Sequence, residues 1–239
     1  MSIWARITDF ITTTASDAFL SVIEAVRTAF EGDPETRRRV TFSIAMIALS
    51  AKMAKADGIV TQDEVTAFEQ IFAIPQEDRT HVERLYNLAK QDVAGFEAYA
   101  QRMAGLCGTG EPNCQILEDI LDGLFHIAKA DGIVHERELS FLTRVAEIFQ
   151  FDEIHFQRIL ARHVHMGDAD PYVVLDLERG VSFAQARSRY RQLVKENHPD
   201  RLIARGVPEE FVAIAGDRIA AINVAWEKIE QELKKHERA

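Results

Sequence analysis

Residues 55–60 read Lys-Ala-Asp-Gly-Ile-Val, and residues 129–134 repeat the same letters. In both copies, apolar residues at helical spacing precede and follow the Asp-Gly pair, which predicts a helix, a tight turn and a second helix. Strict apolar–polar alternation, which is typical of strands, is absent along the chain. The doubled unit therefore predicts an all-α protein in which two related helical hairpins bury their apolar faces together.

The composition is typical of a folded protein without a membrane span. The chain has 239 residues, of which 47% are hydrophobic and 28% charged, so it is long enough for two small domains. The formal net charge of -10 disfavours a nucleic-acid partner, because phosphate binding requires a basic surface. Two cysteines are too few for a disulfide framework and fit a reducing compartment. Since no stretch reaches the roughly 18 apolar residues of a spanning helix, and the N-terminus lacks a signal-peptide pattern, we expect a cytoplasmic protein.

Breaks in the helical pattern divide the chain into three segments. Residues 1–32 have the apolar stripe of an amphipathic helix, which the Gly-Asp-Pro sequence at residues 32–34 ends. The repeats occupy residues 33–165, and residues 168–239 form the third segment. We expect the first helix to pack on the next domain. Peripheral contact with the inner membrane or a partner is the alternative, although the weak negative charge of the helix counts against anionic lipid.

Acidic residues occupy matching places in the two repeats. Asp57 and Glu64 in the first copy correspond to Asp131 and Glu138 in the second. One interpretation is a shared divalent-cation site, because carboxylate oxygens suit Ca²⁺, Mg²⁺ or Mn²⁺. The interpretation that we favour is turn architecture, since Asp and Gly stabilise tight turns and Thr61 with Glu64 forms a capping box. An EF-hand is excluded, because its loop needs acidic ligands at alternating positions.

The repeat region, roughly residues 37–160, resembles the TerB domain, a helical module named for bacterial tellurite-resistance proteins. The resemblance rests on the doubled six-residue unit and on the acidic residue that follows each copy. It implies a helical bundle, and it implies that the four acidic residues named above are candidate metal ligands. The resemblance says more about the fold than about the function.

Three motifs in the C-terminal segment resemble those of a J domain. Residues 171–175 read Pro-Tyr-Val-Val-Leu, residues 190–201 read Tyr-Arg-Gln-Leu-Val-Lys-Glu-Asn-His-Pro-Asp-Arg, and residues 222–229 read Ile-Asn-Val-Ala-Trp-Glu-Lys-Ile. They correspond to the short first helix, the second helix with its His-Pro-Asp loop, and the third helix of that family. The resemblance implies that His198, Pro199 and Asp200 contact a DnaK-type chaperone ATPase and stimulate its ATP hydrolysis.

The expected helix before this tripeptide carries a basic face. Ser182 and Gln185 form a capping box at its start, and Pro199 ends it because the residue before a proline avoids helical geometry. Four basic residues lie along this helix or just after it: Arg187, Arg191, Lys195 and Arg201. Such a stripe is often only a solvated face of little energetic value. On an acidic chain, a one-sided basic stripe favours an acidic partner surface, which the resemblance implies is the chaperone.

The order of a TerB-like region followed by a J domain resembles the DjlA group of bacterial co-chaperones, although here an amphipathic stretch replaces that group's N-terminal membrane span. Asn197 departs from the J-domain pattern, because an aromatic residue is usual there. We predict a co-chaperone whose TerB-like region selects a client protein or a location. The alternative is a metal-binding or envelope-stress interaction module in which the J domain is secondary. We expect neither an enzyme nor a cofactor beyond that metal, since the motifs of nucleophilic, phosphate and zinc sites are missing.

Overall fold

The computed structural model describes residues 34–56, 68–69, 72, 74–91, 95–105, 114–129, 134–163 and 169–236. Within these residues every regular element is a helix, namely ten α-helices and two short 3₁₀-helices. The α-helices are α3 (Pro34–Ala56), α5 (Arg79–Gln91), α6 (Phe96–Ala104), α7 (Gln115–Ala128), α8 (Glu136–Ile148), α9 (Glu153–His163), α10 (Pro171–Val174), α11 (Phe183–Glu196), α12 (Pro199–Arg205) and α13 (Ala213–His236). The 3₁₀-helices are η1 (Gln76–Asp78) and η2 (Glu209–Phe211). The all-α prediction is confirmed for these residues. The two related helical hairpins remain a prediction, because both Asp-Gly turns lie outside the described residues.

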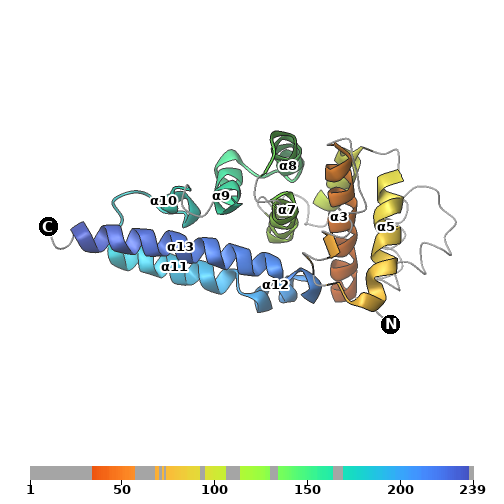
Figure 1. The fold of residues 1–239 in the computed structure, drawn as a ribbon. Helices are drawn as coiled ribbons and strands as arrows, with labels where there is room; N and C mark the ends of the chain where they lie inside the picture. The colour runs from red at the N-terminus through yellow and green to blue at the C-terminus, as the bar shows by residue number, and fades with distance from the viewer. Residues whose placement is uncertain are drawn as a thin grey trace.

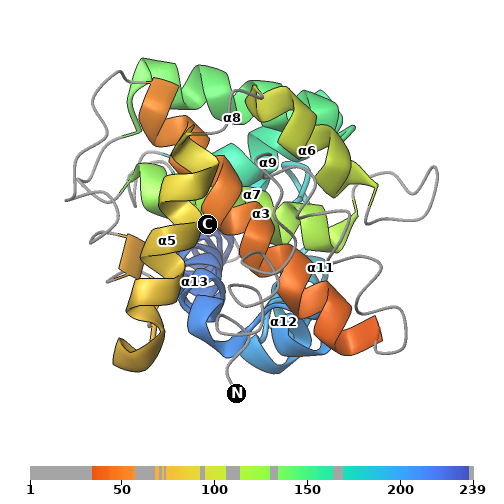
Figure 2. The same cartoon turned by 90° about the vertical axis from the view of Figure 1, so that its right-hand side faces the viewer.

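Helix α3 is the centre of the larger helical bundle. Its residues 40–53 are all buried, and α5, α6, α7 and α8 pack around it (Figures 1 and 2). The Ser43 hydroxyl donates to the carbonyl of Arg39 at 2.9 Å, and the Ser50 hydroxyl donates to the carbonyl of Ile47 at 3.1 Å. These bonds satisfy two buried polar groups within the helix itself. A helix buried on all sides needs no polar face, so α3 has no marked amphipathic pattern.

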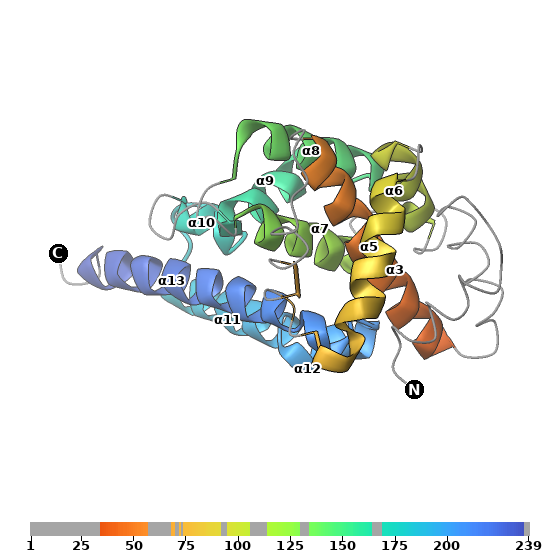
Figure 3. The same ribbon diagram turned by 45° about the vertical axis from the view of Figure 1, so that its right-hand side comes forward.

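Helices α10, α11 and α13 form a second, smaller core. Helices α11 and α13 lie side by side as an antiparallel hairpin that extends from the bundle toward the C-terminus (Figures 1 and 3). Tyr172 of α10 and Leu175, which directly follows α10, are buried in this core. The hairpin contributes five more buried apolar side chains: Ala186, Leu193, Ile222, Ala225 and Ile229.

The connection between α11 and α13 contains a helix where we expected a loop. Pro199–Arg205 form α12, which Gly206 ends in the left-handed conformation with φ of 99°. Helix α13 then begins at Ala213, after η2. Two physical reasons explain the difference: a proline in the first turn favours a helix start, and the fully buried Leu202 gives the segment an apolar face that packs.

The chain after α12 packs into the larger bundle. Val207, Phe211 and Ile214 are almost completely buried and belong to the same apolar core as α3. The ring of Phe211 lies 4.6 Å from the ring of Phe72 and 5.2 Å from that of Phe42, measured between centroids. The bundle and the C-terminal hairpin therefore share one core where α12 and α13 meet α3 and α7.

Three expectations from the sequence concerned the location of the protein in the cell. No helix in the described ranges is long and apolar enough to cross a membrane. The expected amphipathic helix in residues 1–32 lies outside the described residues. Cys114, which directly precedes α7, is disulfide-bonded. The structure therefore does not support the inference of a reducing compartment from the two cysteines.

Candidate functional site

The tripeptide His198-Pro199-Asp200 forms an exposed corner between α11 and α12. His198 is the N-cap of α12, and its Nδ1 accepts a hydrogen bond from the backbone N–H of Asp200 at 3.2 Å. Pro199 is the first residue of the helix, where its missing N–H leaves no donor unsatisfied. The side chains of His198 and Asp200 are 55% and 86% exposed, with 3.5 Å between Nδ1 and Oδ2. A partner can therefore reach an imidazole and a carboxylate that the helix start holds in place.

Local contacts fix the start and the orientation of α11, the helix that ends at this corner. The Ser182 hydroxyl accepts a hydrogen bond from the Gln185 backbone N–H at 3.3 Å, and the Gln185 side chain accepts one from the Ser182 N–H at 3.0 Å. The predicted capping box is thus confirmed. Tyr190 stacks on Trp226 of α13 with 5.0 Å between ring centroids, and its hydroxyl donates to Asn223 at 3.1 Å. These contacts fix the rotation of α11 on α13 and so determine which face of α11 points outward.

The structure separates the basic residues of α11 and of the start of α12 into two sets. All four cations that we expected to face a partner are exposed: Arg187, Arg191, Lys195 and Arg201. None of their side chains forms an ion pair or a side-chain hydrogen bond with another residue of the described ranges. Arg189 differs, because it pairs with Asp176 at 2.7 Å. The free set presents charge of one sign, which favours association with an acidic surface.

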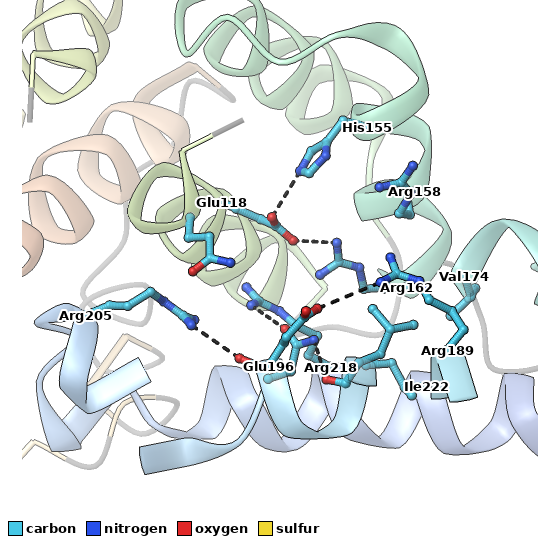
Figure 4. A pocket seen from close by; sticks show the side chains of 13 residues that line it. Glu118, His155, Arg158, Arg162, Val174, Arg189, Glu196, Arg205, Arg218 and Ile222 are labelled. Carbon is cyan, nitrogen blue, oxygen red and sulfur yellow. Dashed lines mark hydrogen bonds and ion pairs between the residues drawn. The ribbon is translucent and has the colours of Figure 1, made fainter. Parts of the chain in front are cut away.

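Helix α7 carries two buried carboxylates, Asp119 and Asp122, and the partly buried Glu118, none of which we predicted from the sequence. The Asp119 carboxylate binds the Arg205 guanidinium of α12 through two hydrogen bonds, of 2.8 and 2.9 Å. Asp119 also lies 3.0 Å from Arg218 of α13, and Arg218 pairs in addition with Asp122. Glu118 precedes them on the same helix (Figure 4). Carboxylates of α7 therefore bind both α12 and α13, the helices that precede and follow η2 in the chain.

Carboxylates of the same helix also bind α9. Glu118 pairs with Arg162 at 2.6 Å and with His155 at 3.0 Å. Asp122 pairs with Arg162 at 3.3 Å and with His163 at 2.5 Å. Ions are tolerated at such depth only when they are paired, because an unpaired buried ion costs several kcal/mol. Helix α7 thus joins the bundle to the C-terminal hairpin through one continuous ionic cluster.

Burial and pairing have opposite effects on the acids of this cluster. At Asp119, burial raises the pKa above its ordinary value, and the guanidiniums of Arg218 and Arg205 offset this only in part. At Asp122, burial also favours the neutral form, but Arg218 and Arg162 prevail and lower the pKa to about 2. Asp122 is therefore ionised at neutral pH.

Asn197 links the ionic cluster to the exposed corner. Its side-chain N–H donates to the carbonyl of Leu193 at 2.8 Å, and its Oδ1 accepts a hydrogen bond from Arg218 at 2.9 Å. The J-domain pattern has an aromatic residue at this position, so the resemblance gave no indication of this role. The signals in the sequence were the acidic residues inside the strongly apolar α7 and an arginine on the inner face of α13.

A cavity of about 170 Å³ lies beside this cluster, between α7, α9, α11 and α13 (Figure 4). Five arginines line it, and each has a carboxylate partner: Arg158, Arg162, Arg189, Arg205 and Arg218. Because these cations are already neutralised, the cavity wall offers a bound anion little net attraction. The arginines of the cavity support the structure, in contrast to the outward cations of α11.

Of the four expected cation ligands, the structure describes Glu138. Asp57, Glu64 and Asp131 lie outside those residues. Glu138 accepts a hydrogen bond from the backbone N–H of His135 at 2.9 Å, which is a capping role at the start of α8. No group of three or more His, Cys, Asp or Glu side chains in the described ranges is arranged to hold a metal ion. The choice between a cation site and turn architecture for the four acidic residues stays a prediction.

Comparison with known proteins covers both regions of the chain. Residues 43–161 match the TerB family, described as tellurite resistance protein TerB. The co-chaperone protein DjlA of Photobacterium profundum is 26% identical, covering 82% of this chain and 79% of its own length. This chain is a distant homologue of the DjlA co-chaperones. The DjlA protein of Coxiella burnetii is 27% identical over 74% of this chain, and that of Haemophilus ducreyi is 22% identical over 90%.

The coverage shows that the DjlA likeness extends beyond the TerB match. The Haemophilus ducreyi relative aligns with 90% of this chain, whereas the TerB match covers residues 43–161. No solved structure matches this chain.

Proposed function

We propose that this protein is a co-chaperone that stimulates ATP hydrolysis by a DnaK-type chaperone. The observation that carries the proposal is the exposed His198-Pro199-Asp200 corner, which lies at the end of a helix whose outward cations have no partner in the described ranges. The distant homology to DjlA co-chaperones supports the same assignment. The chain itself supplies no reacting group, and the chemistry takes place in the chaperone.

The two parts of the site have different tasks in this mechanism. The basic face of Arg187, Arg191 and Lys195 attracts an acidic surface of the chaperone and accelerates the encounter. His198 and Asp200 then contact the chaperone directly from the start of α12. A ligand shifts a conformational equilibrium only through different affinities for its states. The corner therefore binds the hydrolysing conformation more tightly than the resting one.

The remaining segments decide where this activity is used. The TerB-like segment, residues 33–165, selects a client protein or a location, and residues 168–239 bind the chaperone. The sequence predicts that residues 1–32, which precede both segments, form an amphipathic helix. This division is supported by the TerB match, which ends at residue 161, before the hairpin that carries the corner.

Single-turnover ATP hydrolysis by a DnaK-type chaperone tests the proposal. The wild-type chain and a His81→Gln variant, altered on α5 of the bundle, should accelerate hydrolysis equally, whereas His198→Gln should give none of the acceleration. The acceleration should decrease as salt increases, because exposed charges separated by more than about 10 Å are screened at 0.1 M ionic strength. Equal stimulation by His198→Gln and wild type would refute the assignment.

A further inference from the structure

Two arginines that flank the exposed corner meet on one buried carboxylate. On the side of α11, the Arg218 guanidinium donates to Asn197, the residue directly before the corner, at 2.9 Å. On the side of α12, Arg205 donates to the carbonyl of Glu196 at 3.3 Å. Both guanidiniums bind Asp119, which is completely buried in α7. One side chain of the TerB-like bundle therefore holds the end of α11 and the end of α12 together.

Apolar packing on the inner face of α12 also holds this helix against the bundle. Leu202, on the inner face of α12, is fully buried, and Val207 and Phe211 continue into the core of α3. Asp200 and Arg201, on the other face of α12, remain exposed. The bundle thus determines how α12 lies, and with it the direction in which the corner points.

We propose that Asp119 is a positioning residue for the chaperone-binding corner, so that the TerB-like bundle forms part of the chaperone-binding device. This inference rests on the proposed function. The paired hydrogen bonds between Asp119 and Arg205 fix direction as well as distance, as bidentate arginine–carboxylate contacts do. A corner already set at the binding angle loses less conformational freedom when the chaperone binds.

The energetics favour a geometric role for Asp119 over a purely stabilising one. Burial raises the pKa of its carboxyl group despite two neighbouring guanidiniums, which shows that ionisation at this site is opposed by the surroundings. Apolar residues of similar volume often stabilise a fold at least as well as a buried ion pair. A directional contact between two helices is something that apolar packing supplies less well.

The test uses the full chain and compares two ties between the bundle and the hairpin. Arg205→Gln removes the paired contact with Asp119. Asp217→Asn is the matched control, because it breaks the contacts of α13 with His126 and Lys129 of α7, at 2.5 Å each, and leaves the neighbours of the corner unchanged. The readouts are the concentration of each variant that gives half-maximal stimulation of the chaperone, the rate at saturation, and the NMR signals of the His198 imidazole.

A corner that adopts the binding angle only part of the time shows a weaker apparent affinity in proportion. Arg205→Gln should therefore raise the half-maximal concentration about three- to tenfold, with the rate at saturation retained and the His198 signals shifted. Asp119→Asn should raise the half-maximal concentration at least as much, because it weakens the contact with Arg218 as well. Adding Arg205→Gln to Asp119→Asn should change little further, since the contact between the two residues is already lost. Arg205→Lys keeps the positive charge but cannot form the paired hydrogen bonds with Asp119, so it should retain part of the affinity. The same variant replaces Arg205→Gln in the test if Arg205→Gln does not fold.

The outcomes separate this inference from the proposed function. Absence of stimulation by the wild type, or full stimulation by His198→Gln, contradicts the proposed function itself. If the wild type stimulates and His198→Gln does not, an unchanged half-maximal concentration for Arg205→Gln refutes the positioning role alone. An equal loss in Asp217→Asn also refutes it, because any loosening of the two regions would then have the same effect.

Discussion

The outward face of α11 and the inward faces of α12 and α13 both carry arginines, and these have opposite surroundings. Arg187 and Arg191 are exposed and have no ion-pair partner among the described residues. Arg205 and Arg218 are 18% and 3% exposed, and both bind Asp119. The same side chain therefore serves recognition on one face and support on the other. The number and spacing of cations along a helix do not distinguish the two roles. The presence of a carboxylate partner from α7 does distinguish them.

Physical chemistry predicts different penalties for the two faces. Removing a buried cation leaves its carboxylates without compensation, which costs several kcal/mol. Removing an exposed cation changes little in the fold, because water already solvates it. The inward set should therefore govern stability and the outward set association, and the following predictions test this contrast from the largest expected effect to the smallest.

Replacement of the most buried arginine should cause the largest loss of stability. Arg218→Met leaves Asp119 and Asp122 buried without their shared cation, so we expect the free energy of unfolding to fall by about 3 to 5 kcal/mol. Urea denaturation of the full chain measures this. The exposed counterpart, Arg191→Met, should stay within about 0.5 kcal/mol of wild type. A similar loss of unfolding free energy in the two variants would contradict the proposed difference between the inward and outward arginines.

Two glycines test how closely α12 is held against the bundle. Both have positive φ, but a Cβ on Gly206 would lie 2.6 Å from Cβ of Arg38, whereas one on Gly180 would meet nothing within 4 Å. Gly206→Ala should cost about 2 to 4 kcal/mol from backbone strain and crowding, and Gly180→Ala about 1 to 2 kcal/mol from strain alone. Thermal unfolding of both variants measures the difference, and equal losses would argue against close contact between α12 and α3.

The ionic cluster should make stability depend on pH under acidic conditions. The pKa of Asp122 is lowered to about 2 in the folded chain, compared with about 3.9 in an unfolded chain. The stabilisation of about 2 kcal/mol is thus present above pH 4 and is lost as the pH falls toward 2. Unfolding midpoints across this range should fall less steeply for Asp122→Asn than for wild type. The exposed Asp200→Asn serves as control and should follow wild type; parallel curves for all three would contradict the prediction.

The outward face should show the smallest effect on stability and a clear effect on association. Arg187→Glu with Arg191→Glu should change the free energy of unfolding by less than about 0.5 kcal/mol per site. The double variant should nevertheless need more protein for half-maximal stimulation of the chaperone, because it repels an acidic surface. Raising the salt concentration should reduce its difference from wild type. If the double variant stimulates the chaperone as well as wild type at low salt, the basic face is not part of the chaperone-binding site.

Local rules predicted the parts of the site that depend on neighbours in sequence. The capping box of Ser182 and Gln185 set the start of α11, and Pro199 set its end, because both act through the backbone of adjacent residues. The same rules did not predict α12, which needs the buried contact of Leu202 with a distant core. They also did not predict the role of Asn197, whose partner Arg218 comes from another helix.

The sequence by itself determined the helical class, the ends of α11 and the tripeptide at the turn, since these follow from the spacing of apolar residues and from proline and capping chemistry. The tertiary structure decided which arginines are free and which are paired. It also decided that the bundle holds both sides of the corner. The physical reason is that an ion pair depends on a distance of a few ångströms between residues far apart in the chain, as between Asp119 and Arg205, and local pattern carries no information about that distance.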